Sequence, residues 1–270
     1  MIAMWIRSNA SYLLSYASLV FILVAMPTVS VSQENRMKEF NIESLPKGSR
    51  MVVHGTSPVT HAVVWLHGLG ATADDFPPIV PELGLSADRS ILFVFPQAPE
   101  RAITINGGMS MPGWYDIKGV SIEDKQDAVG MAESQALVNQ IVDELLEFGI
   151  ASKNIVLAGF SQGGAVTYFT GVRSKHKLAG LLTLSTYLPF EGDTEKEQSG
   201  VNFKTPIFAS HGSYDPVVPL ALGEASVNVL KGLGYEIQWQ IYPMEHQVAM
   251  EQIQHIGKWL NEVFSNTNKY

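Results

Sequence analysis

Short apolar runs that do not alternate with polar residues constrain the fold of this chain more than any other feature. From residue 60 onward six such runs recur, and most are rich in β-branched or aromatic residues. A strand buried on one face alternates apolar and polar residues, whereas a strand buried on both faces does not. Helical stretches separate the runs, which predicts an α/β fold with a mostly parallel sheet. The expected strands are His61–Leu66, Ile91–Phe95, Ile155–Phe160, Leu178–Leu184, Pro206–Ser210 and Ile237–Tyr242.

The segments between these runs predict helices on both faces of the sheet. Asp127–Phe148 carries an apolar stripe at i, i+3 and i+4 spacing, and Leu220–Leu233 and Gln247–Phe264 resemble it. Ala98–Val120 is rich in Gly, Met and Pro and is expected to be a functional loop, while the charged stretch Phe190–Lys204 is expected to be a solvated surface excursion. No repeat or linker divides the chain, so residues 37–270 are expected to form one domain.

The sequence GFSQG at residues 159–163 is the strongest chemical signal. A G-x-S-x-G match is weak by itself, but here an apolar strand leads into it and a helical pattern follows it. That context predicts a tight strand-to-helix turn that exposes Ser161 as a nucleophile. The backbone N–H of Gln162, at the start of the helix, would then face a developing oxyanion. The alternative is a glycine-rich turn with an inert serine.

A second glycine-containing turn, His67-Gly68-Leu69-Gly70, follows the first long strand. Glycines allow a backbone to approach a ligand closely, so the Leu69 N–H is expected to be the second oxyanion donor. His67 is expected to hold this loop rather than to transfer protons. The alternative is a plain connection without a function.

A serine nucleophile of this kind needs an acid and then a histidine later in the chain. Asp215 and His246 satisfy that order, and each follows an expected strand, where open α/β sheets place their active sites. His211, four residues before Asp215, is expected to be a turn or core histidine. No cluster of His, Asp and Glu has metal-ligand spacing, so no metal and no cofactor is expected.

The composition argues against one class of partner but gives little information about the cellular compartment of the protein. The net charge is −8, so nucleic acid is not an expected partner. The chain has no cysteine, which excludes disulfides and a cysteine nucleophile. The oligomeric state stays open, a homodimer included.

The first 36 residues differ from the rest of the chain. Arg7 is followed by no charged residue until Glu34, and Tyr12–Met26 is almost continuously apolar. With Ser30-Val31-Ser32 as a small-residue cleavage site, the segment predicts a signal peptide and a periplasmic or secreted protein. Two alternatives remain, an uncleaved membrane anchor or a cytoplasmic protein that starts at Met37.

Several runs in order resemble the phospholipase/carboxylesterase family, which includes bacterial carboxylesterases, acyl-protein thioesterases and lysophospholipases. The resemblance spans residues 60–262, and PQAP, INGG and WYDI are most similar to the bacterial carboxylesterase branch. It implies an α/β-hydrolase fold, with residues 37–270 as the catalytic domain. The runs are HGLGATADDF (67–76), PQAP (96–99), INGGMSMPGWYDI (105–117), GFSQGGA (159–165), LSTYLP (184–189), HGSYDPVVP (211–219) and MEHQV (244–248).

The resemblance also assigns roles. It implies Ser161, Asp215 and His246 as a catalytic triad and the Leu69 and Gln162 amides as an oxyanion hole. The segments 109–114 and 186–188 would border the acyl pocket, with Met109, Met111, Trp114 and Leu188 as its substrate-binding residues. One position departs from the pattern, because Glu245 replaces the glycine that usually precedes the histidine.

The expected activity is that of a serine carboxylesterase that hydrolyses short- to medium-chain acyl esters through an acyl-enzyme. Its substrate would be a small-molecule acyl ester, although an acylated lipid or protein is left open. The nearer alternative is an acyl-protein thioesterase or lysophospholipase that acts on long acyl chains. A non-catalytic binding protein on the same scaffold is the more distant alternative, and the intact Ser161, Asp215 and His246 argue against it.

Overall fold

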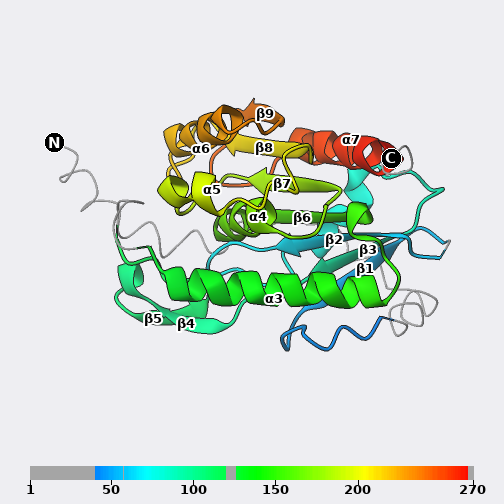
Figure 1. The fold of residues 1–270 in the computed structure, drawn as a ribbon. Coiled ribbons are helices and arrows are strands. Elements are labelled where there is room, and N and C mark those ends of the chain that lie inside the picture. The colour runs from blue at the N-terminus through cyan, green and yellow to red at the C-terminus, as the bar shows by residue number, and fades with distance from the viewer. Residues whose placement is uncertain (1–39, 57, 120–125, 267–270) are drawn as a thin grey trace.

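Seven strands form one central sheet in the computed structural model, which describes residues 40–56, 58–119 and 126–266 (Figure 1). The strand order is β1-β3-β2-β6-β7-β8-β9. Only β1 runs antiparallel to its neighbour in this sheet. The bounds are β1 Arg50–His54, β2 His61–Leu66, β3 Ile91–Phe95, β6 Ile155–Phe160, β7 Gly180–Leu184, β8 Ile207–Gly212 and β9 Ile237–Tyr242.

The central strands lack alternation because both faces of the sheet are covered. In β2, Ala62, Val64 and Leu66 belong to one buried apolar cluster. Val63 and Trp65, between them, belong to a second cluster on the opposite face. Burial of both sets removes the need for a polar side of the strand.

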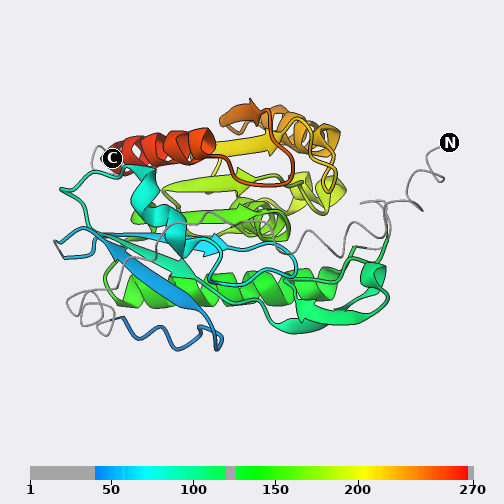
Figure 2. The same ribbon diagram turned by 180° about the vertical axis from the view of Figure 1, so that it is seen from behind.

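Helices cover both faces of the sheet. The first cluster contains side chains of α3 (Ala128–Glu147), α4 (Gln162–Arg173) and α6 (Leu220–Gly232). The second contains side chains of the 3₁₀ helix η2 (Pro77–Leu83) and of α7 (Met250–Asn266), on the side that faces the viewer in Figure 2. The expected mostly parallel α/β-hydrolase fold in a single domain is therefore confirmed.

Several short elements were not expected from the sequence. The expected functional loop contains a hairpin of β4 (Glu100–Ile103) and β5 (Met109–Pro112), which are joined through η3 (Thr104–Asn106). The charged stretch contains α5 (Glu191–Glu197), where Glu197 pairs with Arg173 and Thr194 is buried. Strand β1 and the 3₁₀ helix η4 (Ser152–Asn154), which leads into β6, were also not expected. These elements are short and partly exposed, so their apolar patterns are weak.

Residues 1–36, which were expected to be a signal peptide or membrane anchor, lie outside the described residues. In the part of the chain that the structure describes, no helix combines the length and the apolarity that a bilayer crossing requires.

Candidate active site

Ser161 occupies a strained turn between β6 and α4. Its backbone has φ 54° and ψ −122°, a conformation that few residues other than glycine adopt. The flanking glycines are required by close packing, because a Cβ at Gly159 would lie 2.3 Å from the carbonyl carbon of Gly163. A Cβ at Gly163 would lie 2.5 Å from the carbonyl oxygens of Leu66 and His67. The local sequence therefore forces the serine into this turn.

Hydrogen bonds hold the backbone of Ser161 on both sides. Its N–H donates to the Leu184 carbonyl at 2.8 Å, and its own carbonyl accepts the Ala165 N–H at 3.1 Å. The Thr186 hydroxyl donates to the same carbonyl at 2.7 Å. Thr186 was expected to border the acyl pocket, whereas its buried hydroxyl braces the turn. A sequence gives no signal for a hydroxyl that bonds a backbone so far away along the chain.

Asp215 and His246 meet beyond the ends of β8 and β9. Nδ1 of His246 lies 2.7 Å from Oδ2 of Asp215, whose side chain is fully buried. Oδ1 of Asp215 accepts the N–H groups of Val217 and Val218 at 2.9 and 2.8 Å. An ionised carboxylate only accepts, so Nδ1 carries the proton and Nε2 stays free to act as a base.

Burial raises the pKa of Asp215, but the N–H groups of His211 and His246, the charge of His246 and the Val218 amide lower it more. The pKa therefore lies well below the usual range for an aspartic acid. The carboxyl group stays ionised at neutral pH, which is the state needed to orient an imidazole.

The imidazole of His246 and the serine turn are neighbours. The ring of Phe160, next to Ser161 in the chain, packs on the His246 ring with centroids 4.7 Å apart. Among the hydrogen bonds of the described residues, none joins Ser161 Oγ to His246. Such bonds are often long in a free enzyme and tighten when substrate binds.

The loop after β2 passes directly beside the serine. A Cβ at Gly68 would lie 3.4 Å from Cβ of Ser161, so the backbone at residues 68 and 69 borders the hydroxyl. Nδ1 of His67 bonds the Gly68 carbonyl at 2.7 Å. In a trans peptide the next N–H points away from that carbonyl, so this bond fixes the direction of the Leu69 N–H. Gln162, the first residue of α4, places a second N–H at the turn.

His67 supports this loop as a neutral side chain. The Ala98 N–H donates to Nε2 at 3.0 Å, which leaves the proton on Nδ1. Burial lowers the pKa of His67 and keeps the ring neutral, although the Gly68 carbonyl and the charge of Asp75 oppose the shift. The interpretation of His67 as a residue that holds the loop agrees with these contacts.

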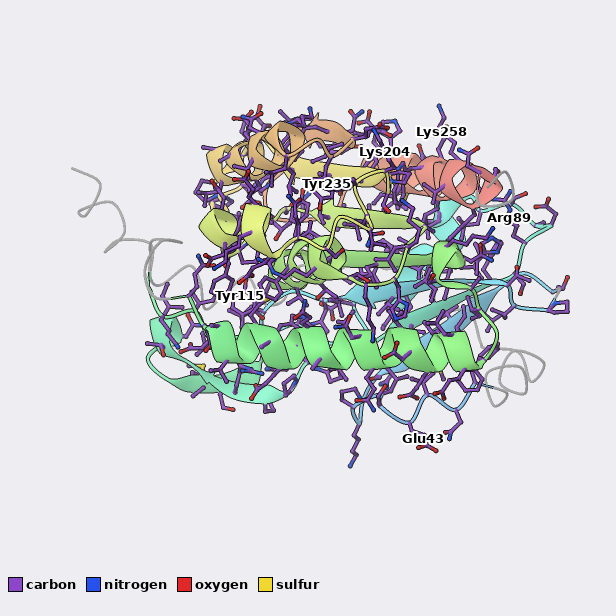
Figure 3. All side chains as sticks on the ribbon, viewed as in Figure 1. Glu43, Arg89, Tyr115, Lys204, Tyr235 and Lys258 are labelled. Carbon is purple, nitrogen blue, oxygen red and sulfur yellow. The ribbon has the colours of Figure 1, made fainter. Side chains whose placement is uncertain are left out.

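Trp114 extends the same support. Its indole N–H donates to the His67 carbonyl at 2.8 Å. The side-chain amide of Gln162 accepts the Trp114 N–H at 2.7 Å and donates to the Tyr115 carbonyl at 2.6 Å. Tyr115 is buried beside α3 (Figure 3) and shares a 2.8 Å hydrogen bond with the hydroxyl of Tyr187. The Gln162 side chain thus ties the serine turn to this loop, a role that sequence reasoning missed.

The four expected substrate-binding residues do not share one environment. Trp114 is fully buried and Leu188 is 2% exposed, and both belong to the core cluster that α3, α4 and α6 cover. Met109 on β5 is 49% exposed. Met111 is partly buried, and its sulfur accepts a bond from the Asn106 side chain. Only the two methionines offer free side-chain surface, on the β4–β5 hairpin.

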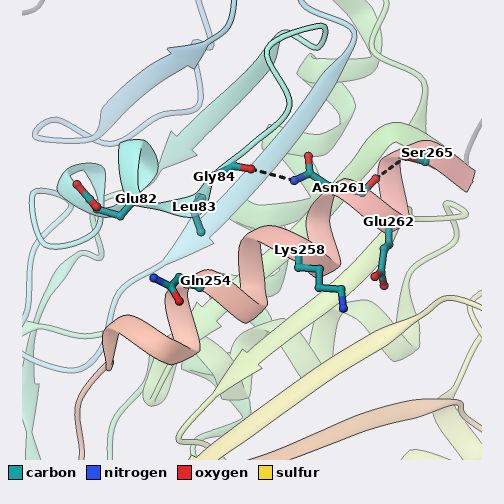
Figure 4. A pocket seen from close by; sticks show the side chains of 8 residues that line it. All are labelled: Glu82, Leu83, Gly84, Gln254, Lys258, Asn261, Glu262 and Ser265. Atoms are coloured by element: carbon teal, nitrogen blue, oxygen red, sulfur yellow. Dashed lines mark hydrogen bonds between the residues drawn. The ribbon is translucent and has the colours of Figure 1, made fainter.

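Two surface hollows lie away from the triad. One, of about 400 Å³, lies between the end of η2 and the C-terminal half of α7 (Figure 4). The other, of about 420 Å³, lies between α3 and the end of α4. Neither contains Ser161, Asp215 or His246. Across residues 40–56, 58–119 and 126–266, no group of three His, Asp or Glu side chains is arranged to hold a metal ion.

A comparison with protein families identifies residues 47–264 as a match to the phospholipase/carboxylesterase model. The chain belongs to the phospholipase/carboxylesterase family. Its relatives include acyl-protein thioesterases and carboxylesterases, so the protein is an ester hydrolase.

Curated relatives in fungi are similar over nearly their whole length. Acyl-protein thioesterase 1 of Neurospora crassa is 35% identical over 230 residues, which cover 81% of this chain and 93% of the relative. The enzyme of the same name from Gibberella zeae is 34% identical over 222 residues, 78% of this chain and 94% of the relative. Among solved structures, Zea mays acyl-protein thioesterase 2 has a TM-score of 0.69 and 25% identity over 80% of this chain and 99% of its own.

These relatives correct the finer placement within the family. The sequence favoured the bacterial carboxylesterase branch, but the carboxylesterase of Bacillus cereus is only 20% identical, with a TM-score of 0.62 over 81% of this chain and 96% of its own. That likeness shows the shared fold alone. Short motifs such as PQAP and WYDI therefore misled the assignment, because they sample few positions of the chain.

The same relatives contradict the expected location. The protein was expected to be periplasmic or secreted, but the curated relatives that match it are acyl-protein thioesterases of fungi. That class of relative points away from an exported enzyme, so the prediction was wrong. An apolar N-terminal run by itself does not identify a signal peptide, because other kinds of segment can be equally apolar.

Proposed function

We propose that the protein hydrolyses long-chain acyl thioesters and related acyl esters, with Ser161 as nucleophile, His246 as base and Asp215 as orienting acid. The 2.7 Å contact between His246 and Asp215 beside the strained Ser161 turn supports the reaction. The similarity to acyl-protein thioesterases over 93% of a relative's length supports the substrate class. It favours this activity over a short- to medium-chain carboxylesterase.

The reaction begins when Nε2 of His246 takes the Ser161 hydroxyl proton and Oγ attacks the acyl carbonyl carbon. The N–H groups of Leu69 and Gln162 stabilise the resulting oxyanion. Collapse of this intermediate expels the thiolate or alcoholate, and the imidazolium returns the proton to it. Water then attacks the acyl-enzyme by the same route and releases the carboxylic acid. Asp215 holds the Nδ1 tautomer and stabilises the imidazolium.

Met109, which is exposed, and Met111, which is partly buried, would contact the acyl chain from the β4–β5 hairpin. Methionine fills irregular space without imposing one shape, which suits acyl chains of differing length. Trp114 and Leu188 are buried, so their contribution would be to hold the walls of the site.

A matched pair of substrates tests the proposal. The full chain is assayed on an S-acyl cysteine peptide and the corresponding O-acyl serine peptide, with acyl chains of two to sixteen carbons. We expect kcat/KM to rise with chain length and to be higher for the thioester. Ser161→Ala is the control and should abolish both activities. A preference for acetate oxyesters without thioester cleavage would contradict the proposal and favour the short- to medium-chain carboxylesterase.

A further inference from the structure

His211, near the end of β8, contacts Asp215, the acid of the triad. None of the roles described above includes this histidine. Its side chain is fully buried. Nε2 lies 2.8 Å from the Val218 carbonyl oxygen and 3.4 Å from Oδ2 of Asp215. The same Oδ2 atom bonds Nδ1 of His246. Two imidazoles therefore face one carboxylate oxygen.

The protonation state of His211 follows from its partners. A carbonyl oxygen can only accept, so Nε2 carries the proton and donates it to Val218 while facing Asp215. Nδ1 is then the unprotonated nitrogen, and it has no hydrogen-bond partner among the described residues. A buried polar atom without a partner is unfavourable, so packing alone would favour an apolar residue here.

The neighbouring elements are shaped around this ring. From α6, Gly223 leaves room for it, because a Cβ there would lie 2.5 Å from Nδ1. From β9, the Trp239 ring lies with its centroid 6.1 Å away. These contacts hold the imidazole in one orientation, with Nε2 toward the carboxylate.

We propose that His211 is a positioning residue that locks the Asp215 carboxylate and withdraws part of its charge from His246. The inference rests on the proposed function, in which Asp215 orients the base. The Nε2–H group of His211 donates to Val218 and also lies 3.4 Å from Oδ2, so its positive end restricts the carboxylate rotamer and makes that oxygen a weaker acceptor. The imidazolium that His246 becomes during the reaction is then stabilised less than by an unshared carboxylate.

In the part of the chain that the structure describes, two histidines contact the Asp215 carboxylate. Asp215 is met by His246 from the loop after β9, by His211 from β8 and by the amides of residues 217 and 218. Glycine and tryptophan face His211 from α6 and β9, so neither adds a charge there. Glu245, beside His246, is exposed and is identical in every variant compared below.

The test compares His211→Gln with His211→Met in the full chain. The two side chains have similar length and shape, but only glutamine offers an N–H near the position of Nε2. We expect His211→Met to lower kcat about tenfold, because a less firmly held carboxylate orients His246 less well and small misplacements at an active site cost this much or more. We also expect it to move the acidic midpoint of the kcat/KM profile upward by about half a unit, because Asp215 then favours the imidazolium more strongly. His211→Gln should restore both values.

Packing alone predicts a different pattern. Equal losses in the glutamine and methionine variants, or an acidic midpoint that does not move in the methionine variant, would overturn the proposal. If His211→Met does not fold, His211→Asn replaces it, since its amide is too short to reach Asp215 and should give the same two changes. His176→Gln, a remote histidine paired with Asp143, is the matched control and should leave the profile unchanged. If the wild-type protein does not hydrolyse acyl thioesters or acyl esters, the proposed function itself is refuted.

Discussion

Strand β2 begins with the buried His61 and is followed directly by the buried His67, and the two side chains are placed very differently. At the carboxyl end, both ring nitrogens of His67 have partners, and the ring orients the loop beside Ser161. At the amino end, Nδ1 of His61 meets the Thr60 hydroxyl at 2.8 Å, while Nε2 is buried without a hydrogen-bond partner in the described part of the chain.

The difference extends to the whole sheet. We call the side at which the parallel strands end the carboxyl edge, and the side at which they begin the amino edge. At the carboxyl edge, backbones lie so close that Gly159 and Gly163 cannot bear a side chain, and buried amides bridge the loops. At the amino edge, the end of α7 is attached by Arg89, which bonds Asn261 and Ser265 (Figure 3). The carboxyl edge is thus built to fix the atoms of a reaction, whereas the amino edge only closes the fold.

Of the substitutions that test this contrast, Asp215→Asn at the carboxyl edge should have the largest effect, and it should act on kcat. An asparagine cannot hold the Nδ1 tautomer of His246, so we expect kcat to fall by roughly 10⁴. The melting temperature should also fall, because the contacts that lower the pKa of Asp215 stabilise the fold and an amide cannot replace all of them. Steady-state kinetics and thermal unfolding measure both quantities. Asp193→Asn on α5 is the control, and a comparable loss in that variant instead would show that the acid is misassigned.

Gly163→Ala should damage the carboxyl edge structurally. The added Cβ would lie 2.5 Å from two carbonyl oxygens that cannot move without shifting β2. We expect the free energy of unfolding to fall by about 3 kcal/mol, as for severe overpacking. Urea denaturation measures it. Gly107→Asn in the hairpin turn is the matched control, where the site is open and asparagine tolerates the positive φ. Equal losses in both variants would remove the claimed difference in packing.

Met109→Ala should change specificity without changing stability. Because the side chain is half exposed, its removal should leave the melting temperature almost unaltered. Burial of such a side chain by an acyl chain is worth about 1.5–3 kcal/mol, so kcat/KM for a long chain should drop roughly tenfold or more. The value for an acetyl ester should change much less. Val129→Ala on α3, also exposed, is the control, and parallel losses on both substrates would exclude a role for Met109 in acyl binding.

His61→Phe should have the smallest effect and should act only on stability in acid. Burial and the charge of Arg89 lower the pKa of His61 from its usual 6.5 to about 4. The unfolded chain therefore takes up the proton first, and stability falls as the pH drops from 6.5 to 4. The variant keeps a ring against Phe264, 4.7 Å away, but cannot be protonated.

Melting temperatures measured between pH 7.5 and 4 test this expectation. The wild type should lose more stability over that range than His61→Phe, with equal activity at pH 7.5. His176→Gln should retain the wild-type pH dependence. Superimposable curves for wild type and His61→Phe would show that the amino edge carries no acid-sensitive group at His61.

The sequence predicted most of the central sheet because burial on both faces leaves a clear signal. Four of the expected strands, those beginning at His61, Ile91, Ile155 and Ile237, have the observed bounds. The order of Ser161, Asp215 and His246 was visible because each follows a strand. Strand β1 and the β4–β5 hairpin were missed, since short and half-exposed strands lack that signal.

The surroundings of the site could not be predicted in the same way. Trp114 was expected in the acyl pocket because large apolar residues suit either a pocket or a core, and only the fold shows that it is buried. His211 was expected to be a turn or core histidine, and its distance to Asp215 depends on the path of the loop after β8. Side-chain hydrogen bonds between distant segments, such as Thr186 to Ser161, leave no periodic pattern.

Covalent labelling tests the central claim most directly. A fluorophosphonate reacts with a serine only where a base activates the hydroxyl and an oxyanion site receives the phosphoryl oxygen. After the full-length protein is labelled, digestion and mass spectrometry locate the adduct. The account predicts one adduct on Ser161, complete loss of hydrolysis on labelling, and at least a thousandfold slower labelling in Asp215→Asn, in keeping with its loss of kcat. An unlabelled protein, or an adduct on another serine that accompanies the loss of activity, would contradict it.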